Sequence, residues 1–403
     1  MKTNQRILYS FLAVRFISAL GDQILLFAVP LLVYKITGSI SMSGLAFFIE
    51  WLPRLISLPF AGALSDKLGG VHVYLFSDGM RAVICSMAFM LILNFPQHAF
   101  LVISLLMGAC AFFYAQSFIA MEASIPMLVG KENVAHAQSL LQGVEQSALI
   151  FGPLLSSLLL LMLPIKALLL LAGMCFLFSF IGIGIIKKYN KTLHTILSKK
   201  TTKAPLLVDM KRGWNIFFKN KKIVLLSILT IMINLIWGLC LSTTAALITG
   251  FYHLDTKIYG VFQTSAGIVV VILSIGLSFI VKRFSTFSIG ISAYFLMVMG
   301  GLLIAFGLSI HSIYPFAIGF MMVMSFDSAF NVYIRSERVH LIPDQDLGKT
   351  IGVIVLINQL SLPLAGLLVS TLSKTLGMNI LFTLISLLAL GFIVIVFGKL
   401  KAV

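Results

Sequence analysis

Apolar runs of membrane-spanning length recur from one end of the chain to the other. Each holds roughly 20 residues, which is enough for a helix to cross a hydrocarbon core of about 30 Å, and most of the polar connections between them are short. The pattern predicts an all-α membrane protein with twelve transmembrane helices. The predicted spans are 8–34, 41–64, 72–94, 98–122, 136–162, 164–187, 222–249, 258–281, 286–308, 312–334, 349–372 and 377–399.

One connection is much longer than the others and divides the spans into six plus six. Residues 187–222 carry eleven lysine or arginine residues and one acid, Asp209. Within this stretch Leu207, Trp214 and Phe217 recur near helical spacing with basic residues between them, which predicts an amphipathic helix. The predicted segments are a six-helix bundle in 1–186, a basic linker in 187–221 and a second six-helix bundle in 222–403.

The basic side chains of the linker are suited to anionic lipid headgroups. We therefore expect residues 205–219 to lie on the inner leaflet of the membrane. A solvated linker without regular structure is the alternative.

The distribution of charge predicts how the chain is oriented. Its net charge is +16, from 29 lysine and arginine and 13 aspartate and glutamate residues, yet only 10% of residues are charged and 60% are hydrophobic. Only Lys35, Lys166, Lys257 and Lys374 fall in loops opposite the N-terminus, an asymmetry that follows the positive-inside rule. It predicts two cytoplasmic termini in a bacterial inner membrane and no nucleic-acid partner.

Several charged side chains nevertheless fall inside the first two spans. The first contains Arg15, Asp22 and Gln23, and the second contains Glu50 and Arg54. A charge at membrane depth costs at least ~2.5–3.5 kcal/mol, so these groups need partners or a water-filled cavity. Because Arg15 and Asp22 share a helix face and Glu50 and Arg54 are i,i+4 neighbours, the spacing favours ion pairs within each helix.

The segment between the second and third spans carries a recognisable motif. Gly62-x-Leu-Ser-Asp66-Lys67-x-Gly69 resembles the loop motif of the major facilitator superfamily, and so do the twelve spans in two halves. Leu52-Pro53-Arg54 and Phe151-Gly152-Pro153 are similar to the branch of macrolide-efflux and enterobactin-exporter proteins. The resemblance implies a transporter in which two six-helix halves give access to a central site alternately from each side.

The resemblance also implies a gate at the cytoplasmic side. Asp66 is expected to bind the start of the eleventh span, around residues 347–350, and glycines permit the tight turn. Two residues of the third span are expected to support the same corner. The predicted gate residues are Gly62, Asp66, Lys67, Gly69, Asp78 and Arg81.

Four acids inside spans are candidates for proton coupling. Asp22 is preferred, because the first span lines the cavity in the superfamily that the chain resembles. Glu50 has Arg54 one turn away, Glu145 belongs to a polar stripe on the fifth span, and Asp327 is the acid deep in the second half. A buried ion-pair network that only fixes helix packing is the alternative.

Polar and aromatic side chains on these spans are candidates for substrate binding. Arg15 and Arg54 offer positive charge to an anionic, carboxylate-rich ligand such as a siderophore. For any single aromatic side chain, a packing role is the alternative. The other candidates are Gln23, Tyr114, Gln142, Asn234, Trp237 and Asn331.

Motifs for other chemistries are absent from the sequence. It contains no Gly-x-x-x-x-Gly-Lys-Ser/Thr phosphate loop, no Gly-x-Ser-x-Gly elbow and no histidine pair at metal-ligand spacing on one helix. We therefore predict no enzyme activity, cofactor or metal.

The sequence as a whole predicts a monomeric, proton-coupled secondary transporter that exports a bulky organic solute, either a siderophore or a drug-like compound. An importer of an anionic carboxylate-type siderophore or other organic anion is the alternative. A non-transporting membrane receptor on the same fold is the third possibility.

Overall fold

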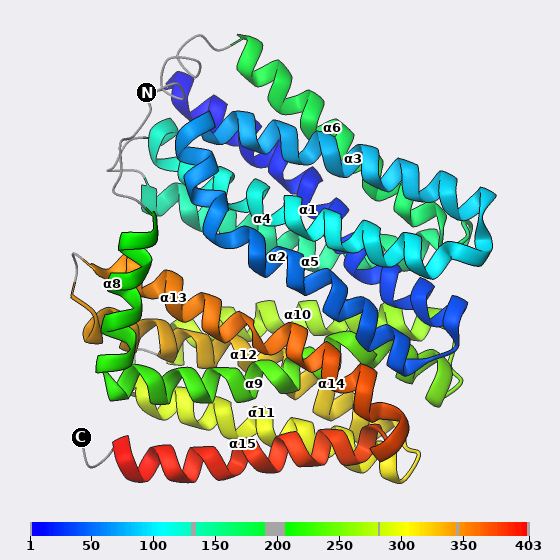
Figure 1. Cartoon of the computed structure of the whole chain (residues 1–403), viewed down its shortest axis with the longest axis vertical. Helices are drawn as coiled ribbons and strands as arrows, with labels where there is room; N and C mark the ends of the chain where they lie inside the picture. Colours follow the sequence, from blue (N-terminus) through cyan, green and yellow to red (C-terminus); the bar gives the residue numbers. More distant parts are fainter. Residues whose placement is uncertain (1, 130–133, 190–205, 281–282, 344–345, 401–403) are drawn as a thin grey trace. The chain divides into compact units, whose positions relative to one another are not determined.

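The computed structural model describes residues 2–129, 134–189, 206–280, 283–343 and 346–400, and no strand occurs among them (Figure 1). The all-α prediction is therefore confirmed. The helices of the N-terminal part are α1 (Lys2–Thr37), α2 (Ile40–Leu68), α3 (Gly70–Asn94), η1 (Pro96–His98), α4 (Ala99–Val129), α5 (Val134–Leu159) and α6 (Ala167–Tyr189). Those that follow are α8 (Leu206–Lys219), α9 (Lys221–Ala246), η3 (Leu247–Phe251), α10 (Thr256–Ile280), α11 (Thr286–Ser309), α12 (Ile313–Leu341), α13 (Leu347–Gln359), α14 (Ser361–Leu376) and α15 (Met378–Leu400).

Helices occupy all twelve predicted membrane spans. In the described part of the chain, ten stretches are long and apolar enough to cross a membrane. The other two predicted spans correspond to α5, a 26-residue helix that carries the polar stripe with Glu145, and to α15, whose described apolar stretch is Met378–Ile393. The chain is thus a multi-pass membrane protein.

The eleventh predicted span is one apolar stretch but two helices. α13 ends at Gln359 and α14 begins at Ser361, so the regular helix is interrupted at Leu360. Pro363 explains the interruption, because proline has no amide hydrogen to donate to the carbonyl of Gln359 and its ring crowds that carbonyl.

The chain forms two compact units that differ from two contiguous halves. One contains Met1–Gly38, Ile49–Thr202 and Thr256–Thr264, and the other contains Ser39–Phe48, Lys203–Asp255 and Ser265–Val403. The first turns of α2 and of α10 therefore each belong to the unit that does not contain the rest of the helix. We refer to these as the first unit and the second unit.

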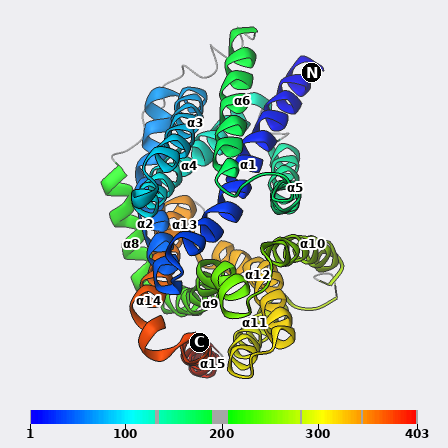
Figure 2. The same cartoon turned by 90° about the vertical axis from the view of Figure 1, so that its right-hand side faces the viewer.

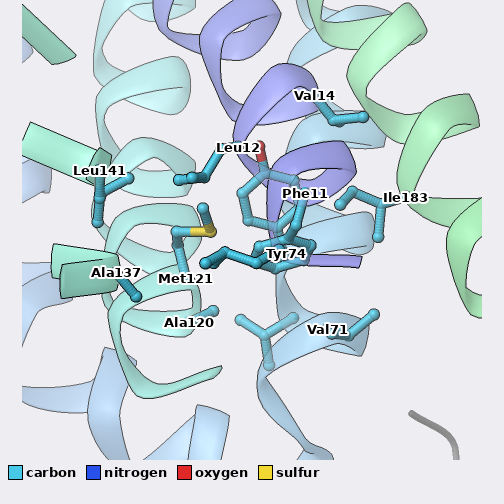
Figure 3. Packing of buried hydrophobic residues seen from close by; sticks show 12 residues of the cluster. Phe11, Leu12, Val14, Val71, Tyr74, Ala120, Met121, Ala137, Leu141 and Ile183 are labelled. Atoms are coloured by element: carbon cyan, nitrogen blue, oxygen red, sulfur yellow. The ribbon is translucent and has the colours of Figure 1, made fainter. Parts of the chain in front are cut away.

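In the first unit, α1 packs against α4, α5 and α6, and Figure 2 shows α1 between α5 and α6. α3 in turn packs against α4 and α6. An apolar cluster joins these helices, in which Phe11 of α1 packs against Tyr74 of α3 with their rings 6.1 Å apart (Figure 3). The same cluster includes Met121, Leu141 and Ile183, from α4, α5 and α6. It fixes the helices that carry the charged residues described below.

In the second unit, α9 packs against α12, α13, α14 and α15, and α11 packs against α12 and α15. The first turns of α2 also pack here, because a Cβ at Gly44 would lie only 2.7 Å from the carbonyl oxygen of Gly366. Ser41 Oγ donates a hydrogen bond of 2.5 Å to the carbonyl of Ser370 in the same region. Small residues therefore permit a close approach of α2 to α14.

Helix α8 lies within the stretch where the sequence predicts an amphipathic helix. Phe217 is buried in an apolar cluster with residues of α9 and α13, while Phe218, Lys211 and Lys219 are exposed. Arg212 makes a two-point ion pair with Asp346, through Nε–Oδ1 at 2.7 Å and Nη2–Oδ2 at 2.9 Å. One of the basic groups expected to face lipid is thus bound to the protein.

The predicted loop around Gly62–Gly70 is mostly helix. α2 continues to Leu68, and only Gly69 separates it from α3. Gly69 has φ 85°, a conformation that favours glycine. Lys67 is exposed, whereas the side-chain surroundings of Asp66, and those of Gly62, lie outside the described part of the structure.

Candidate functional site

Three polar residues of α1, Arg15, Ser18 and Asp22, lie on one helix face. Arg15 is fully buried. Its Nε donates a hydrogen bond of 2.7 Å to Glu145 Oε1 on α5, and its Nη1 lies 3.9 Å from Asp22 Oδ2. Nη1 is also 3.5 Å from Ser18 Oγ. The structure therefore brings together Arg15 and Asp22, as their spacing predicts, and adds Glu145 to them.

The second buried arginine is Arg81 of α3. It forms an ion pair with Asp22 and another with Asp78, whose Oδ1 lies 3.2 Å from Arg81 Nη1. Its Cζ lies 3.7 Å from the ring centroid of Phe176, a cation–π contact. Asp22 thus lies between two arginines, which offset the cost of burying its charge.

Asp78 is held by hydrogen bonds from two neighbouring helices. Ser117 of α4 donates to Oδ1 at 3.1 Å and Ser179 of α6 donates to Oδ2 at 2.6 Å. Ser179 Oγ is also 3.1 Å from the hydroxyl of Tyr74, which belongs to the apolar cluster of Figure 3. The charged residues are therefore connected directly to the packed core.

These contacts correct the predicted places of Asp78 and Arg81. Both were expected to support the corner between the second and third spans, but both instead contact side chains inside the bundle. The reason is depth: Arg81 lies eleven residues after Gly70, about 16 Å along α3 at 1.5 Å per residue. We call Arg15, Asp22, Asp78, Arg81 and Glu145 the charged network.

The members of the charged network differ in exposure. The side chain of Glu145 is 24% exposed, compared with 10% for Asp22 and 0% for Asp78. On the same helix Gln142 is exposed, and on α1 the half-buried Gln23 packs against Gly152 of α5. Glu145 is thus the most exposed acid of the charged network.

The predicted pair between Glu50 and Arg54 is not formed. Arg54 instead lies over two aromatic rings, with Cζ 4.4 Å from the centroid of Trp51 and 4.2 Å from that of Tyr114. Glu50 is buried, and among the described residues it makes no hydrogen bond and no ion pair within 4.0 Å. Two rings stabilise the arginine where the spacing predicted a carboxylate.

The two asparagine candidates of the second unit contact the backbone. Asn331 donates to the carbonyl of Asp327 at 3.0 Å, and Asn234 donates to the carbonyl of Asn358 at 3.1 Å. Trp237 is half-buried on α9. Asn358 was not predicted, although its buried side-chain oxygen and nitrogen have no hydrogen-bond partner in the described structure. An amide inside an apolar run, five residues before Pro363, was the available signal.

Family and sequence comparisons agree with this architecture. A family model described as Major Facilitator Superfamily matches residues 11–361. The chain is 31% identical over 137 residues to the multidrug efflux pump Tap of Mycolicibacterium fortuitum, covering 33% of this chain and 34% of Tap. It is 31% identical over 163 residues to the enterobactin exporter EntS of Shigella boydii, covering 40% of this chain and 38% of EntS. The matches thus span little more than a third of each relative.

Solved structures of similar fold cover nearly the whole chain. One is a bacterial homologue of the iron transporter ferroportin in an inward-facing state, with TM-score 0.76 and 17% identity over 97% of this chain and 98% of the other. Another is the nucleoside transporter NupG, with TM-score 0.77 and 11% identity over 98% of this chain and 99% of the other. At such identities the likeness shows the fold alone.

Proposed function

Because the chain belongs to the Major Facilitator Superfamily, we propose that it is a proton-coupled secondary transporter that exports a bulky organic solute by alternating access. The resemblance inferred from its sequence motifs is confirmed, and the chain is a membrane transport protein and not an enzyme. Its relatives named as an efflux pump and an exporter support the outward direction. We further propose a monomer in a bacterial inner membrane with both termini in the cytoplasm.

The observation that carries proton coupling is the charge balance of the network. Two guanidinium groups meet three carboxyl groups, so full ionisation leaves one excess negative charge inside the first unit. Counting Arg54 and Glu50 as well leaves the same excess. An unbalanced charge in the membrane interior is costly, and one bound proton removes it.

Glu145 is the acid that we assign to proton exchange. Asp22 is enclosed by two arginines, and Asp78 is fully buried behind serine hydroxyl groups, so a proton reaches either of them less readily. The sequence favoured Asp22 because it lies on the first span. The partial exposure of Glu145 moves our preference to α5.

Arg15 provides a way for that proton to change the structure. It lies close to Glu145, at 2.7 Å, and farther from Asp22, at 3.9 Å, where Asp22 Oδ2 accepts no hydrogen bond among the described residues. When Glu145 takes up a proton, Arg15 loses its nearest negative charge and is drawn toward Asp22. We propose that this change of partner shifts α5 against α1 and couples the proton to alternating access. Asp327 remains a candidate for a second proton site.

Transport by reconstituted protein tests the coupling. Inverted vesicles with a proton gradient are expected to accumulate at least one of erythromycin, tetracycline, aerobactin and the aromatic carboxylate ciprofloxacin. Glu145→Gln should abolish accumulation but retain exchange of labelled for unlabelled substrate, because exchange needs no net proton movement. Glu337→Gln is the matched control, since Glu337 pairs with Lys222 in the second unit at 3.3 Å.

Two outcomes would count against this function. Accumulation by Glu145→Gln at the level of the wild type would remove Glu145 from the coupling step. Accumulation in right-side-out but not inverted vesicles would favour the importer of an organic anion.

A further inference from the structure

We propose that Arg54 binds the anionic end of the substrate, and that the substrate class is an aromatic carboxylate. The inference rests on the proposed transport function, because it concerns what the carrier recognises. The first three spans contain three arginines. Arg15 and Arg81 form ion pairs with carboxylates, and Arg54 does not. That difference separates the group that can receive a ligand from the groups that hold the protein together.

The position of Arg54 is fixed by the packing of α2 against α4. Gln116 Nε2 donates to Ser57 Oγ at 2.7 Å, and Ser57 Oγ donates to the carbonyl of Phe112 at 3.0 Å. Gly108 allows the helices to approach closely, since a Cβ there would lie 3.1 Å from the carbonyl oxygen of Ile49. This register places Arg54 over Tyr114.

The aromatic contacts hold the guanidinium group without using its hydrogen-bond donors. Cζ lies 4.4 Å from the ring centroid of Trp51 and 4.2 Å from that of Tyr114. Among the residues that the structure describes, none accepts a hydrogen bond from Arg54 or forms an ion pair with it within 4.0 Å. The planar group carries five N–H donors, which match the two oxygens of a carboxylate in a bidentate arrangement.

The surroundings also fit an aromatic frame on the ligand. Tyr114 stacks on Phe118 with ring centroids 6.0 Å apart and an angle of 15° between the rings, and both side chains are half-buried. Because Arg54 already lies over the ring of Tyr114 and Phe118 stacks on that ring, a ligand ring packs against the edges of these side chains and not between them. In the proposed complex, a carboxylate attached directly to a ring binds the N–H donors of Arg54 while the ring makes these edge contacts.

The same ring connects this site to the charged network. The centroid of Tyr114 lies 5.8 Å from Cζ of Arg81, and Arg81 binds Asp22. A ligand on Arg54 thus lies one side chain, Tyr114, away from Arg81, which is a member of the charged network. Glu50 lies one turn before Arg54 and forms no ion pair with it within 4.0 Å.

Binding of a matched pair of probes to purified protein tests the site. 2-Naphthoate and 2-naphthamide have the same shape and differ in charge, so calorimetric titration of both isolates the contribution of the anion. We expect the wild type to bind 2-naphthoate at least about tenfold more tightly, the lower end of what a charge-assisted hydrogen bond contributes. Arg54→Gln should abolish the preference, and Glu50→Gln should preserve it.

Controls make the result specific to this position. Arg283→Gln removes the same charge from an exposed site and should leave the preference at the level of the wild type. If Arg54→Gln does not fold, Arg54→Lys decides the question, because it keeps the charge but not the bidentate geometry and should reduce the preference several-fold. The proposal is overturned if the Arg54 variant that folds prefers 2-naphthoate as strongly as the wild type does. It is also overturned if the wild type binds both probes equally or binds neither. Such a result leaves the proton-coupling proposal to the Glu145 experiment, since binding needs no gradient.

Discussion

Replacing Arg81 by glutamine tests whether the charged network stabilises the first unit. Arg81 contacts two carboxylates, Asp22 and Asp78, and lies over the ring of Phe176. Its loss leaves three carboxyl groups with Arg15 alone, so the excess of negative charge rises from one to two. No described side chain is placed to replace it, because the remaining contacts of Asp78 come from neutral serine hydroxyl groups.

The expected loss of stability is large. Removing one partner of a buried ion pair costs about 3–5 kcal/mol, because the other partner stays buried without compensation. For a unit of 150–250 residues, each kcal/mol lowers the midpoint of thermal unfolding by about 2–4 °C, so Arg81→Gln should lower it by roughly 6–20 °C. Arg81→Lys should lose less, since it keeps the charge but cannot reach both carboxylates with a planar fork.

Thermal unfolding of purified protein, followed by tryptophan fluorescence, measures the effect. The double variant Asp22→Asn, Arg81→Gln removes one charge of each sign and should recover part of the loss, because the excess returns to one. Arg283→Gln, at an exposed site, serves as the control for lost charge alone. The reasoning is refuted if Arg81→Gln unfolds within about 2 °C of the wild type, or if the double variant unfolds below both single variants.

Three further predictions concern Gly69 and helix α8. Gly69→Ala should cost about 1–3 kcal/mol, because φ 85° and ψ 131° lie in a region that is almost restricted to glycine, and would be measured by thermal unfolding. Arg212→Gln should release α8 from Asp346 and speed tryptic cleavage after Lys219, a site that the substitution leaves in place, while unchanged cleavage there would mean that apolar packing alone holds the helix. Replacing the exposed Lys211 and Lys219 by glutamine should weaken binding to vesicles containing phosphatidylglycerol, and the difference should shrink at high salt. If the wild type bound neutral vesicles as tightly as vesicles containing phosphatidylglycerol, the result would argue against a contact with anionic lipid.

The helices were predictable because they depend on properties of short stretches. The length and hydropathy of a segment decide whether it spans a membrane, and every predicted span is helical in the structure, the eleventh as two helices. The interruption at Leu360 and the continuation of α2 to Leu68 were not predicted. The first depends on the backbone geometry imposed by Pro363, and the second on a helix that continues beyond its apolar part.

Contacts between helices were harder to predict, because they depend on depth and rotation together. The i,i+4 spacing suggested a pair between Glu50 and Arg54, but the rings of Trp51 and Tyr114 lie nearer to the guanidinium group. The burial of Arg81 could have been predicted, since counting residues along the third span places it deep in the bundle. The contacts of Ser117 and Ser179 could not, because nothing in the sequence distinguishes serines that bind a carboxylate from those that bond their own helix.

A final prediction concerns Tyr114, which lies between the unpaired Arg54 and the paired Arg81. A ligand that bound Arg15 would have to compete with Glu145 and Asp22, whereas a ligand at Arg54 displaces no carboxylate. Binding can therefore occur without breaking the charged network, and Tyr114 is the side chain that contacts both regions. We expect binding of 2-naphthoate to the wild type to release protons from the charged network. Tyr114→Leu removes the ring, and the fold reduction in protons released per bound 2-naphthoate should exceed the fold reduction in affinity for 2-naphthoate. Tyr114→Phe keeps the ring and should behave as the wild type; if the two variants release equal amounts, Tyr114 does not connect binding to the network.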